Sequence, residues 1–493
     1  MKSAHQAIKE LWTTLGLPEK ILERLRLTGN TETAVQSSFR LGAAAQASIA
    51  SSALGAAYFN ELNTGKTQTV SVDARHAVLE CASERLYELD GKPPPPLWDP
   101  LAGAYRTRDG WVRIHTNFPH HRDGILKILG CEASREEVSA ALRSWTALEF
   151  ETVASQQGMC VAALRSFDEW DATPQARANE GVPPVEVVRI GDAPSRPRDS
   201  SSHAPFDGIR VLELTRVLAG PTCGRTLAGH GADVLWVTSP NLPDLPGLDV
   251  DTSRGKRTTQ LDLTHEDDLH RLRTLASDAD VFLQSYRADA LADKGLSPTD
   301  LAALKPGIVY AHLNAHGWNG PWRTRRGFDS LVQTASGFNL AEAQAFGSED
   351  QGPDALEPQP RPLPFQALDH VAGYMLALGI SSALCRRITE GGSWEVRVSL
   401  AGVASWIRGL GRVSGEVMAV ARPLHLPGSA EVEALLEPWR ADADGRVIRA
   451  IRHAARLSCS DSTTDVLGDE GSNIESRQLI APLVLNRHRP VWR

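Results

Sequence analysis

The second half of the chain alternates short apolar strands with segments of helical spacing. Between residues 206 and 314, the stretches IRVLELT, ADVLWVTS, DVFLQSY and GIVYAHLNA are separated by such segments. Helical connections of this length imply right-handed crossovers, which place the strands parallel in one sheet. The pattern therefore predicts a doubly wound α/β domain. Domains of this kind bind ligands at the carboxyl ends of their strands, here the loops after Leu214, Val237, Leu283 and Leu313.

The length and composition indicate a multidomain protein that acts on small molecules. A chain of 493 residues exceeds what one core ordinarily supports. The net charge of −8 argues against a nucleic-acid partner. The six cysteines are scattered without CxxC spacing, as is typical of reduced thiols. Because no apolar run approaches the roughly 18 residues of a membrane span and the N-terminus has no signal-like apolar region, we expect a cytoplasmic protein without a membrane partner.

Composition shifts divide the chain into several segments. Residues 1–40 are expected to be helical, and a proline run separates the first segment from a hairpin whose turn lies at Asp109-Gly110. A stretch rich in proline, serine and charge has the composition of a linker. The predicted divisions are a helix–strand–helix segment at 1–100, a small α+β domain at 101–190, the linker at 191–206, the doubly wound domain at 207–420 and a divergent C-terminal segment at 421–493.

A diverged internal repeat links the two ends of the chain. TGKTQTVSVDA aligns with EGGSWEVRVSLA, so that the same helix–turn–strand pattern occurs twice. At this offset Asp369 aligns with Ala43, and the first copy has no carboxylate between Leu41 and Asn60. We therefore expect one copy to be catalytic and the other to be structural.

Asp369 is the candidate catalytic residue. It lies in the otherwise apolar helical stretch ALDHVAGYMLALG, where a charged side chain is costly unless it is paired or has a chemical role. The alternative interpretation is a helix N-cap, because aspartate is a favoured capping residue. Both interpretations place the carboxylate at the start of a buried helix.

Four stretches carry a resemblance to a known family. They are residues 206–237, 254–263 (RGKRTTQLDL), 325–338 (RRGFDSLVQTASGF) and the helix of Asp369 followed by EGGSWEVRVSL. The chain resembles the family III CoA-transferases, the CaiB/BaiF family, which includes formyl-CoA, carnitine and bile-acid CoA-transferases and the α-methylacyl-CoA racemases. The resemblance implies a Rossmann-like parallel-sheet CoA-binding domain and a smaller α+β domain. The internal repeat would be a copy of the family's C-terminal half, in a partly duplicated or permuted order.

The family resemblance also implies a chemistry. Asp369 occupies the place of the family's covalent nucleophile, which moves CoA from an acyl-CoA donor to a small carboxylic acid. Coenzyme A would enter as a substrate, with no permanently bound cofactor. Members of the family form interlocked dimers, so the resemblance implies either a homodimer or a pseudo-dimer within one chain. An acyl-CoA racemase or isomerase and a non-catalytic CoA-binding protein are the alternatives.

Candidate CoA-binding residues come from the loops of the doubly wound domain. The loop after the first strand precedes a helix, whose N-terminus favours anions, although an ordinary turn is the alternative interpretation. A basic cluster at 254–257 is either a phosphate clamp or a solvated edge. The strand DVFLQSY and the aspartate of the third stretch are carried over from the family. The predicted cofactor-binding residues are Arg216, Val217, Leu218, Ala219, Arg257, Gln284, Tyr286 and Asp329.

Two further patterns bear on racemisation and on metal binding. Racemase members have a histidine before the aspartate of the third stretch, whereas this chain has Phe328, whose ring cannot transfer a proton. His312 and His316 are four residues apart but lie in a strand and loop, where this spacing does not place them on one face. We therefore expect neither racemisation by that pair nor a metal site.

Overall fold

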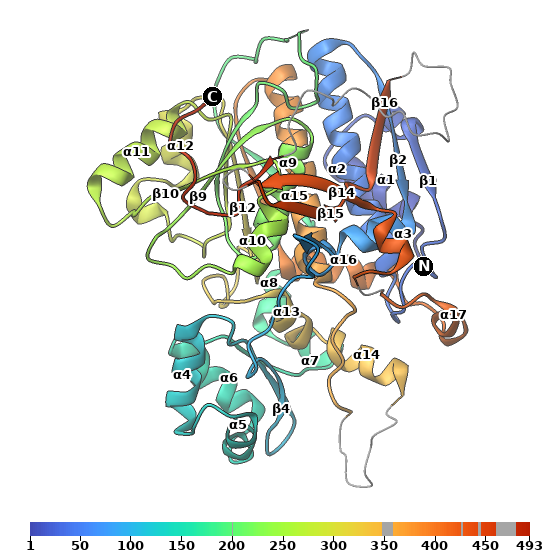
Figure 1. The fold of residues 1–493 in the computed structure, drawn as a ribbon, viewed down its shortest axis with the longest axis vertical. Helices are drawn as coiled ribbons and strands as arrows, with labels where there is room; N and C mark the ends of the chain where they lie inside the picture. The colour runs from blue at the N-terminus through green and yellow to red at the C-terminus, as the bar shows by residue number, and fades with distance from the viewer. Residues whose placement is uncertain (200, 348–357, 425–426, 442–444, 460–479) are drawn as a thin grey trace.

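A seven-stranded, mainly parallel sheet forms the centre of the molecule (Figure 1). The computed structural model describes residues 1–199, 201–347, 358–424, 427–441, 445–459 and 480–493. The strand order is β10-β9-β8-β11-β12-β13-β7, and only β7 runs antiparallel to its neighbour. The mixed α/β class with a parallel sheet is thus confirmed. The strands are β7 (Val185–Gly191), β8 (Arg210–Leu214), β9 (Asp233–Thr238), β10 (Arg257–Gln260), β11 (Val281–Gln284), β12 (Val309–Asn314) and β13 (Ser393–Ser399).

Helices cover both faces of this sheet, as the buried, nearly continuous apolar strands require. Val211 and Leu283 belong to one buried cluster with side chains of α9 and α15. Their neighbours Leu212 and Phe282 belong to a second cluster with side chains of α11 and α12. The covering helices are α9 (Ala219–Gly229), α11 (Glu266–Ser277), α12 (Pro298–Leu304) and α15 (Ala367–Thr389), and α10 (Pro246–Thr252), η3 (Ala292–Lys294), α13 (Asp329–Ala335), α14 (Phe338–Phe346) and α16 (Leu400–Leu410) complete this part.

The N-terminal segment is built around α2, not as a run of helices. The expectation that residues 1–40 are helical is wrong in part, because Leu25–Thr28 is a strand that pairs in parallel with β2. The predicted turn is present, since Gly65 ends α2 with a φ of 79° that favours glycine. The elements are α1 (Ala4–Thr14), η1 (Glu19–Arg24), β1 (Leu25–Thr28), α2 (Leu41–Thr64), β2 (Gln68–Asp73), α3 (Ala74–Glu80), η2 (Ser83–Arg85) and β3 (Glu88–Leu89).

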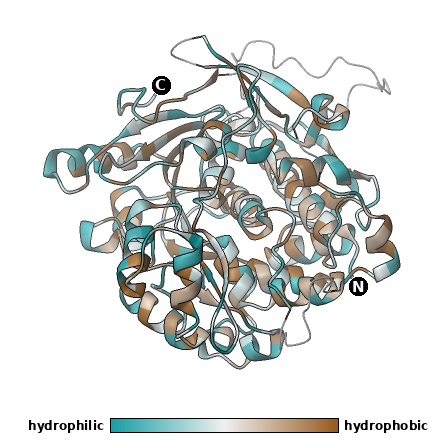
Figure 2. Ribbon diagram, turned by 60° about the horizontal axis from the view of Figure 1, so that its bottom comes forward, coloured by the Kyte–Doolittle hydropathy of each residue, from teal (hydrophilic) through white to brown (hydrophobic). Residues whose placement is uncertain are grey.

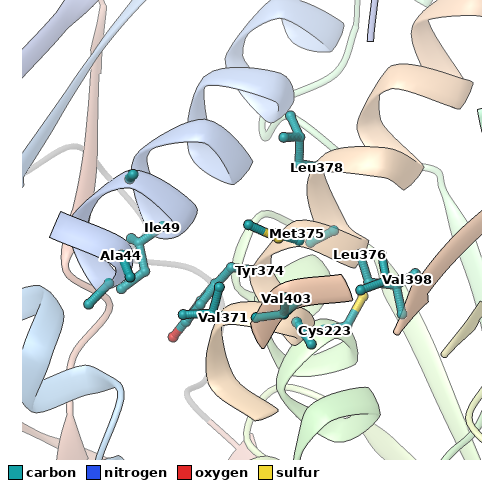
Figure 3. Close-up of a cluster of buried hydrophobic side chains, with 14 of the residues drawn as sticks. Ala44, Ile49, Cys223, Val371, Tyr374, Met375, Leu376, Leu378, Val398 and Val403 are labelled. Carbon is teal, nitrogen blue, oxygen red and sulfur yellow. The ribbon is translucent and has the colours of Figure 1, made fainter. Parts of the chain in front are cut away.

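The helices α2 and α15 pack directly against each other in the core. Ala44 and Ile49 of α2 lie across from Tyr374 and Met375 of α15 (Figure 3). Small residues permit a close approach, because a Cβ added to Gly55 would lie 2.9 Å from the Cβ of Ser381. The two helices that the sequence aligned as copies are therefore spatial neighbours, and their common origin stays a prediction.

The small domain projects from one end of the molecule (Figure 1). The hairpin predicted around Asp109 is present, and its strands β4 and β5 pair antiparallel. The chain then enters the large sheet as β7, before the stretch that has the composition of a linker. The domain's elements are β4 (Gly103–Arg106), β5 (Trp111–Ile114), α4 (Pro119–Leu129), α5 (Arg135–Leu142), α6 (Ala147–Gln156), β6 (Val161–Ala163), α7 (Phe167–Asp171) and α8 (Pro174–Ala178).

The C-terminal segment returns to the N-terminal one. Strand β16 pairs antiparallel with β2, and β15 pairs with β3, so that both ends of the chain share two small sheets. The domain boundaries drawn from the sequence remain predictions. The described elements are α17 (Gly415–Val420), α18 (Ala430–Glu433), β14 (Leu436–Ala441), β15 (Val447–Ile451), β16 (Ala455–Cys459) and β17 (Ile480–Ala481).

Helix α15 is long and apolar. An 18-residue window within its 23 residues has a mean hydropathy of 1.3, so by length and composition alone the helix could cross a membrane. The expectation that no apolar run approaches the length of a membrane span is therefore wrong for α15. In the structure 94% of this window is buried. Figure 2 shows brown, apolar segments on helices throughout the molecule. The apolar character of α15 is accounted for by its place in the core.

Candidate active site

The N-terminus of α15 is capped by a side chain from another helix. Gln366 is the N-cap residue and forms no capping bond with its side chain, while Asp369 lies within the first turn. The interpretation of Asp369 as the N-cap is therefore wrong. Instead, the Asp329 Oδ2 accepts hydrogen bonds from the backbone N–H groups of Leu368 (2.7 Å) and Asp369 (3.0 Å). Asp329 begins α13, so the predicted site residue positions the predicted nucleophile.

A chain of amide groups fixes the orientation of Asp329. The Gln333 side-chain amide donates to its Oδ1. The Gln333 Oε1 in turn accepts from the Asn339 amide at 3.0 Å and from the Leu363 N–H at 3.0 Å. Because both ends of Gln333 are engaged, the amide cannot reverse without losing these bonds. The carboxylate of Asp329 is thus held rigidly beside the first turn of α15.

A third buried carboxylate, Glu84, approaches Asp369 from the N-terminal segment. Its Oε2 lies 2.9 Å from the His370 Nε2, and its other oxygen has no hydrogen-bond partner among the described residues. The preceding residue, Ser83, donates to Asp251 at 2.6 Å and anchors this turn on the large domain. Neither Glu84 nor His370 was predicted from the sequence as a site residue. His370 could have been noticed as the neighbour of Asp369, whereas Glu84 has no local signal.

Burial and neighbouring carboxylates disfavour the ionised form of Asp369. Burial, and then the charges of Asp329 and Glu84, raise the pKa of Asp369 well above its ordinary value. Burial raises the pKa of Asp329 to about 6, although its three hydrogen bonds favour the charged form. No hydrogen bond to the Asp369 carboxyl is formed within the described residues. The Asp369 carboxyl is therefore buried, close to two other carboxyl groups and without a hydrogen-bond partner among the described residues, the kind of environment in which functional carboxyl groups are found.

The predicted binding loop lies against this helix. An added Cβ on Gly373, one turn after Asp369, would lie 2.7 Å from the Ala219 carbonyl oxygen. That loop follows β8. Along the chain, β9 and β10 extend the sheet on one side of β8, whereas β11, β12 and β13 extend it on the other side, so the strand order diverges between β8 and β11. Such a divergence is the topological switch point at which doubly wound sheets bind ligands. Leu218 and Ala219 are buried there as the N-cap and first residue of α9.

A pocket opens at the carboxyl ends of β8 and β9. Val217 has a φ of 71° within it, a strained conformation for a β-branched residue that is characteristic of functional sites. The Arg216 guanidinium lies 4.9 Å above the Phe118 ring of the small domain. Burial raises the pKa of Asp249, another lining residue missed from the sequence, to about 7. The lining residues are Phe118, Arg216, Val217, Trp236, Thr238, Ser239, Leu242, Pro243, Asp244, Leu245, Asp249 and Leu485.

The remaining predicted binding residues are placed differently. Tyr286 lies near Arg216. Burial raises the pKa of the Tyr286 hydroxyl, and the charge of Arg216 offsets part of that increase. Gln284 is turned inward, with its amide near His312 and its Oε1 accepting from the Tyr286 N–H at 2.7 Å. Arg257 begins β10 at the amino end of the sheet and pairs with Asp233 at 2.9 Å. That pairing and position do not favour a phosphate contact by Arg257.

The small domain closes the other side of the carboxylate cluster. Phe328, the residue before Asp329, stacks on His115 with ring centroids 3.8 Å apart. Burial lowers the pKa of His115 to about 3, so its imidazole is neutral. In the described part of the chain no group of His, Cys, Asp and Glu has the arrangement of a metal site, and this includes His312 and His316.

Comparison with known proteins identifies a family. Residues 24–195 and 206–447 match the model of CoA-transferase family III. The acetyl-coenzyme A transferase nodX of Hypoxylon pulicicidum is 29% identical over 62% of this chain and 54% of its own length. A probable fatty acyl-CoA transferase of Mycobacterium tuberculosis is 34% identical over 42% of this chain and 52% of its own.

Two further similarities complete the comparison. The succinate–glutarate CoA-transferase of Agrobacterium fabrum is 30% identical over 50% of this chain and 63% of its own length. A crystal structure of a hypothetical protein from Mycobacterium tuberculosis is 33% identical over 42% of this chain and 58% of that one, with a TM-score of 0.37. The chain thus spans between about half and two thirds of the length of the relatives it matches.

Proposed function

The chain belongs to CoA-transferase family III, and on that premise we propose that it transfers CoA from an acyl-CoA to a carboxylic acid through a covalent intermediate on Asp369. Coenzyme A is then a substrate, no cofactor is permanently bound, and the acyl-CoA and a small acid are the partners. The supporting observation is the Asp369 carboxyl itself, which is buried and lacks a hydrogen-bond partner in the described chain. Its helix meets the loop at the switch point.

The proposed reaction divides one exchange into covalent steps. The ionised Asp369 attacks the thioester carbonyl, and CoA leaves as a thiolate, which forms a mixed anhydride on the enzyme. The thiolate attacks the aspartyl carbonyl, releases the donor acid and leaves an aspartyl-CoA thioester. The acceptor carboxylate attacks that thioester, and the returning thiolate forms the new acyl-CoA and frees Asp369. Each step exchanges one acyl group between an oxygen and a sulfur nucleophile.

The neighbouring residues have supporting roles in this proposal. Asp329 holds the first turn of α15 by accepting two of its N–H groups. Arg216, Val217, Leu218, Ala219 and Tyr286 line or support the path to CoA. Because the attacking form is the carboxylate and its pKa is raised, kcat/KM should increase with pH as Asp369 ionises.

The N-terminal segment has a place in the proposal as well. We take it to be a degenerate copy of the family's C-terminal half, which makes the chain a pseudo-dimer. The packing of α2 on α15 and the reach of Glu84 to His370 are the supporting contacts. The first copy carries Ala43 where the second carries Asp369, so one site is active.

Mass spectrometry of the intact protein tests the proposed intermediate. After incubation with an acyl-CoA, the wild type should carry an adduct that hydroxylamine removes, because both the anhydride and the thioester are cleaved by it. Asp369→Ala should be folded, inactive and free of adduct, and the exposed Asp278→Asn serves as the matched control. Transfer within about tenfold of wild type by folded Asp369→Ala would refute the assignment.

A further inference from the structure

Glu84 is a buried carboxylate in a short helix that is fastened to the large sheet domain. It lies in η2 of the N-terminal segment and is 1% exposed. The preceding residue, Ser83, donates to the Asp251 carboxylate at 2.6 Å and accepts from the Arg225 guanidinium at 2.8 Å. Because Arg225 lies on α9 and Asp251 on α10, η2 is held by two helices of the large domain at the residue next to Glu84.

One oxygen of Glu84 bonds a side chain of α15. The Glu84 Oε2 lies 2.9 Å from the His370 Nε2, and both side chains are buried. A buried hydrogen bond to a charged group contributes more than one between neutral groups. His370 directly follows Asp369 in the first turn of α15. The bond therefore ties the turn that carries the proposed nucleophile to η2 of the N-terminal segment.

The hydrogen bond to His370 does not by itself require a carboxylate. The other oxygen of Glu84, Oε1, is shielded from solvent and has no hydrogen-bond partner among the described residues. Such an unsatisfied oxygen is costly in the interior, and a glutamine would offer His370 the same acceptor without a buried charge. A purely structural role therefore does not account for the carboxylate at this position.

The charge of Glu84 acts on the proposed nucleophile. After burial, the carboxylates of Asp329 and Glu84 are what raise the pKa of Asp369. The other charged or titratable groups that face these carboxyl groups are His370 of α15, Arg225 of α9, Asp251 of α10 and Arg113 of β5. Arg225 and Asp251 pair with each other. The N-terminal segment thus places a like charge near Asp369, on a turn that the large domain holds in place.

We infer that Glu84 is a positioning residue for the reaction: through His370 it holds the first turn of α15, and its charge lies near the reacting carboxyl. This inference rests on the proposed function, because it assigns a further role at the same site. The ionised Asp369 is fixed in place for attack and, close to a like charge, is more basic than an isolated carboxylate. The N-terminal segment, which carries Ala43 where the second copy carries the nucleophile, thereby contributes to the one active site.

Two substitutions at Glu84 separate its hydrogen bond from its charge. Glu84→Gln keeps an acceptor for His370 and removes the charge, whereas Glu84→Met has a similar length and removes both. Glu23→Gln, at an exposed position of the same segment, is the control. Acetyl-CoA and succinyl-CoA are tested as donors with butyrate and glutarate as acceptors, and kcat and KM of the most active pair are measured between about pH 5 and pH 9. Urea unfolding of each variant monitors the fold.

The two variants should differ in kcat but share a displaced pH profile. Glu84→Gln should keep its maximal kcat within about threefold of wild type, because the bond to His370 remains. Its rise of kcat/KM with pH should move to lower pH by about one unit, since Asp369 ionises more readily without the like charge. Glu84→Met should show the same displacement and lose about 10- to 100-fold in kcat. The KM for the acyl-CoA should stay within about threefold in both, because a positioning residue does not contact the substrate.

Several outcomes would overturn the inference. An unchanged pH profile in Glu84→Gln would show that the charge does not act on the nucleophile. Equal losses of kcat in both variants would reject the role of the hydrogen bond, and a raised KM with normal kcat would indicate a substrate contact instead. If Glu84→Met does not fold, the pH profile and kcat of Glu84→Gln decide alone. Any of these results with a hydroxylamine-sensitive adduct on the wild type rejects only this inference, whereas a wild type without adduct or transfer overturns the proposed function too.

Discussion

Replacing Asp369 with asparagine should abolish transfer and yet stabilise the protein at neutral pH. Asparagine has nearly the same shape as aspartate but cannot ionise. The Asp369 carboxyl accepts no hydrogen bond from the described residues, so the substitution removes none. The N–H of the same residue would still donate to the Asp329 Oδ2, now 3.0 Å away. The change therefore isolates the cost of the buried carboxyl group.

The magnitude follows from the raised pKa. Burial and two neighbouring carboxylates raise the pKa of Asp369 above its ordinary 3.8, whereas in the unfolded chain it ionises freely. A raised carboxyl pKa means that stability is greatest below the unfolded pKa and is lost as the pH rises towards the folded one. The loss amounts to about 1.4 kcal/mol for each pH unit in that interval. Between about pH 4 and neutrality the wild type should therefore lose stability progressively relative to Asp369→Asn, at no more than that rate.

Urea unfolding between about pH 4 and pH 8 measures this difference. The two proteins should have similar unfolding free energies near pH 4, and the variant should become progressively more stable above it. Asp278→Asn, an exposed substitution, should follow the wild-type curve. Parallel curves for wild type and Asp369→Asn, or a less stable variant at neutral pH, would refute the reasoning that Asp369 is held in a costly state.

Two further predictions concern the repeat and the CoA path. Ala43→Asp should not restore activity to Asp369→Ala. It should lower the unfolding free energy by about 2 to 5 kcal/mol, because Ala43 is 1% exposed in the core. Turnover by the double variant would show that the two copies are interchangeable. Arg216→Ala should raise the KM for acyl-CoA about tenfold. Arg257→Ala should leave that KM unchanged but lower the unfolding free energy by about 1 to 3 kcal/mol, because the ion pair with Asp233 is lost. A raised KM in Arg257→Ala and an unchanged KM in Arg216→Ala would instead identify Arg257 as the phosphate contact.

Local patterns in the sequence determined much of the fold. The alternation of strands and helices after residue 206 indicated the parallel sheet, because a period of two or of 3.6 residues reports directly on backbone conformation. The turn at Gly65 and the hairpin at Asp109 were likewise local, since each depends on a residue suited to its own backbone angles. Asp369 stood out because a single charge interrupts an apolar helix. The loop at Arg216 followed from its place after a predicted strand.

Only the tertiary structure decided which distant residues these elements contact. Glu84 and His370 are 286 residues apart, and nothing near Glu84 distinguishes it from a solvent-exposed glutamate. Likewise, Arg257 was predicted to contact phosphate, but in the structure it lies on the edge strand β10 and pairs with Asp233. Periodicity shows which face of an element is buried but not the partner that buries it. That choice depends on packing between distant segments, and so does the raised pKa of Asp369.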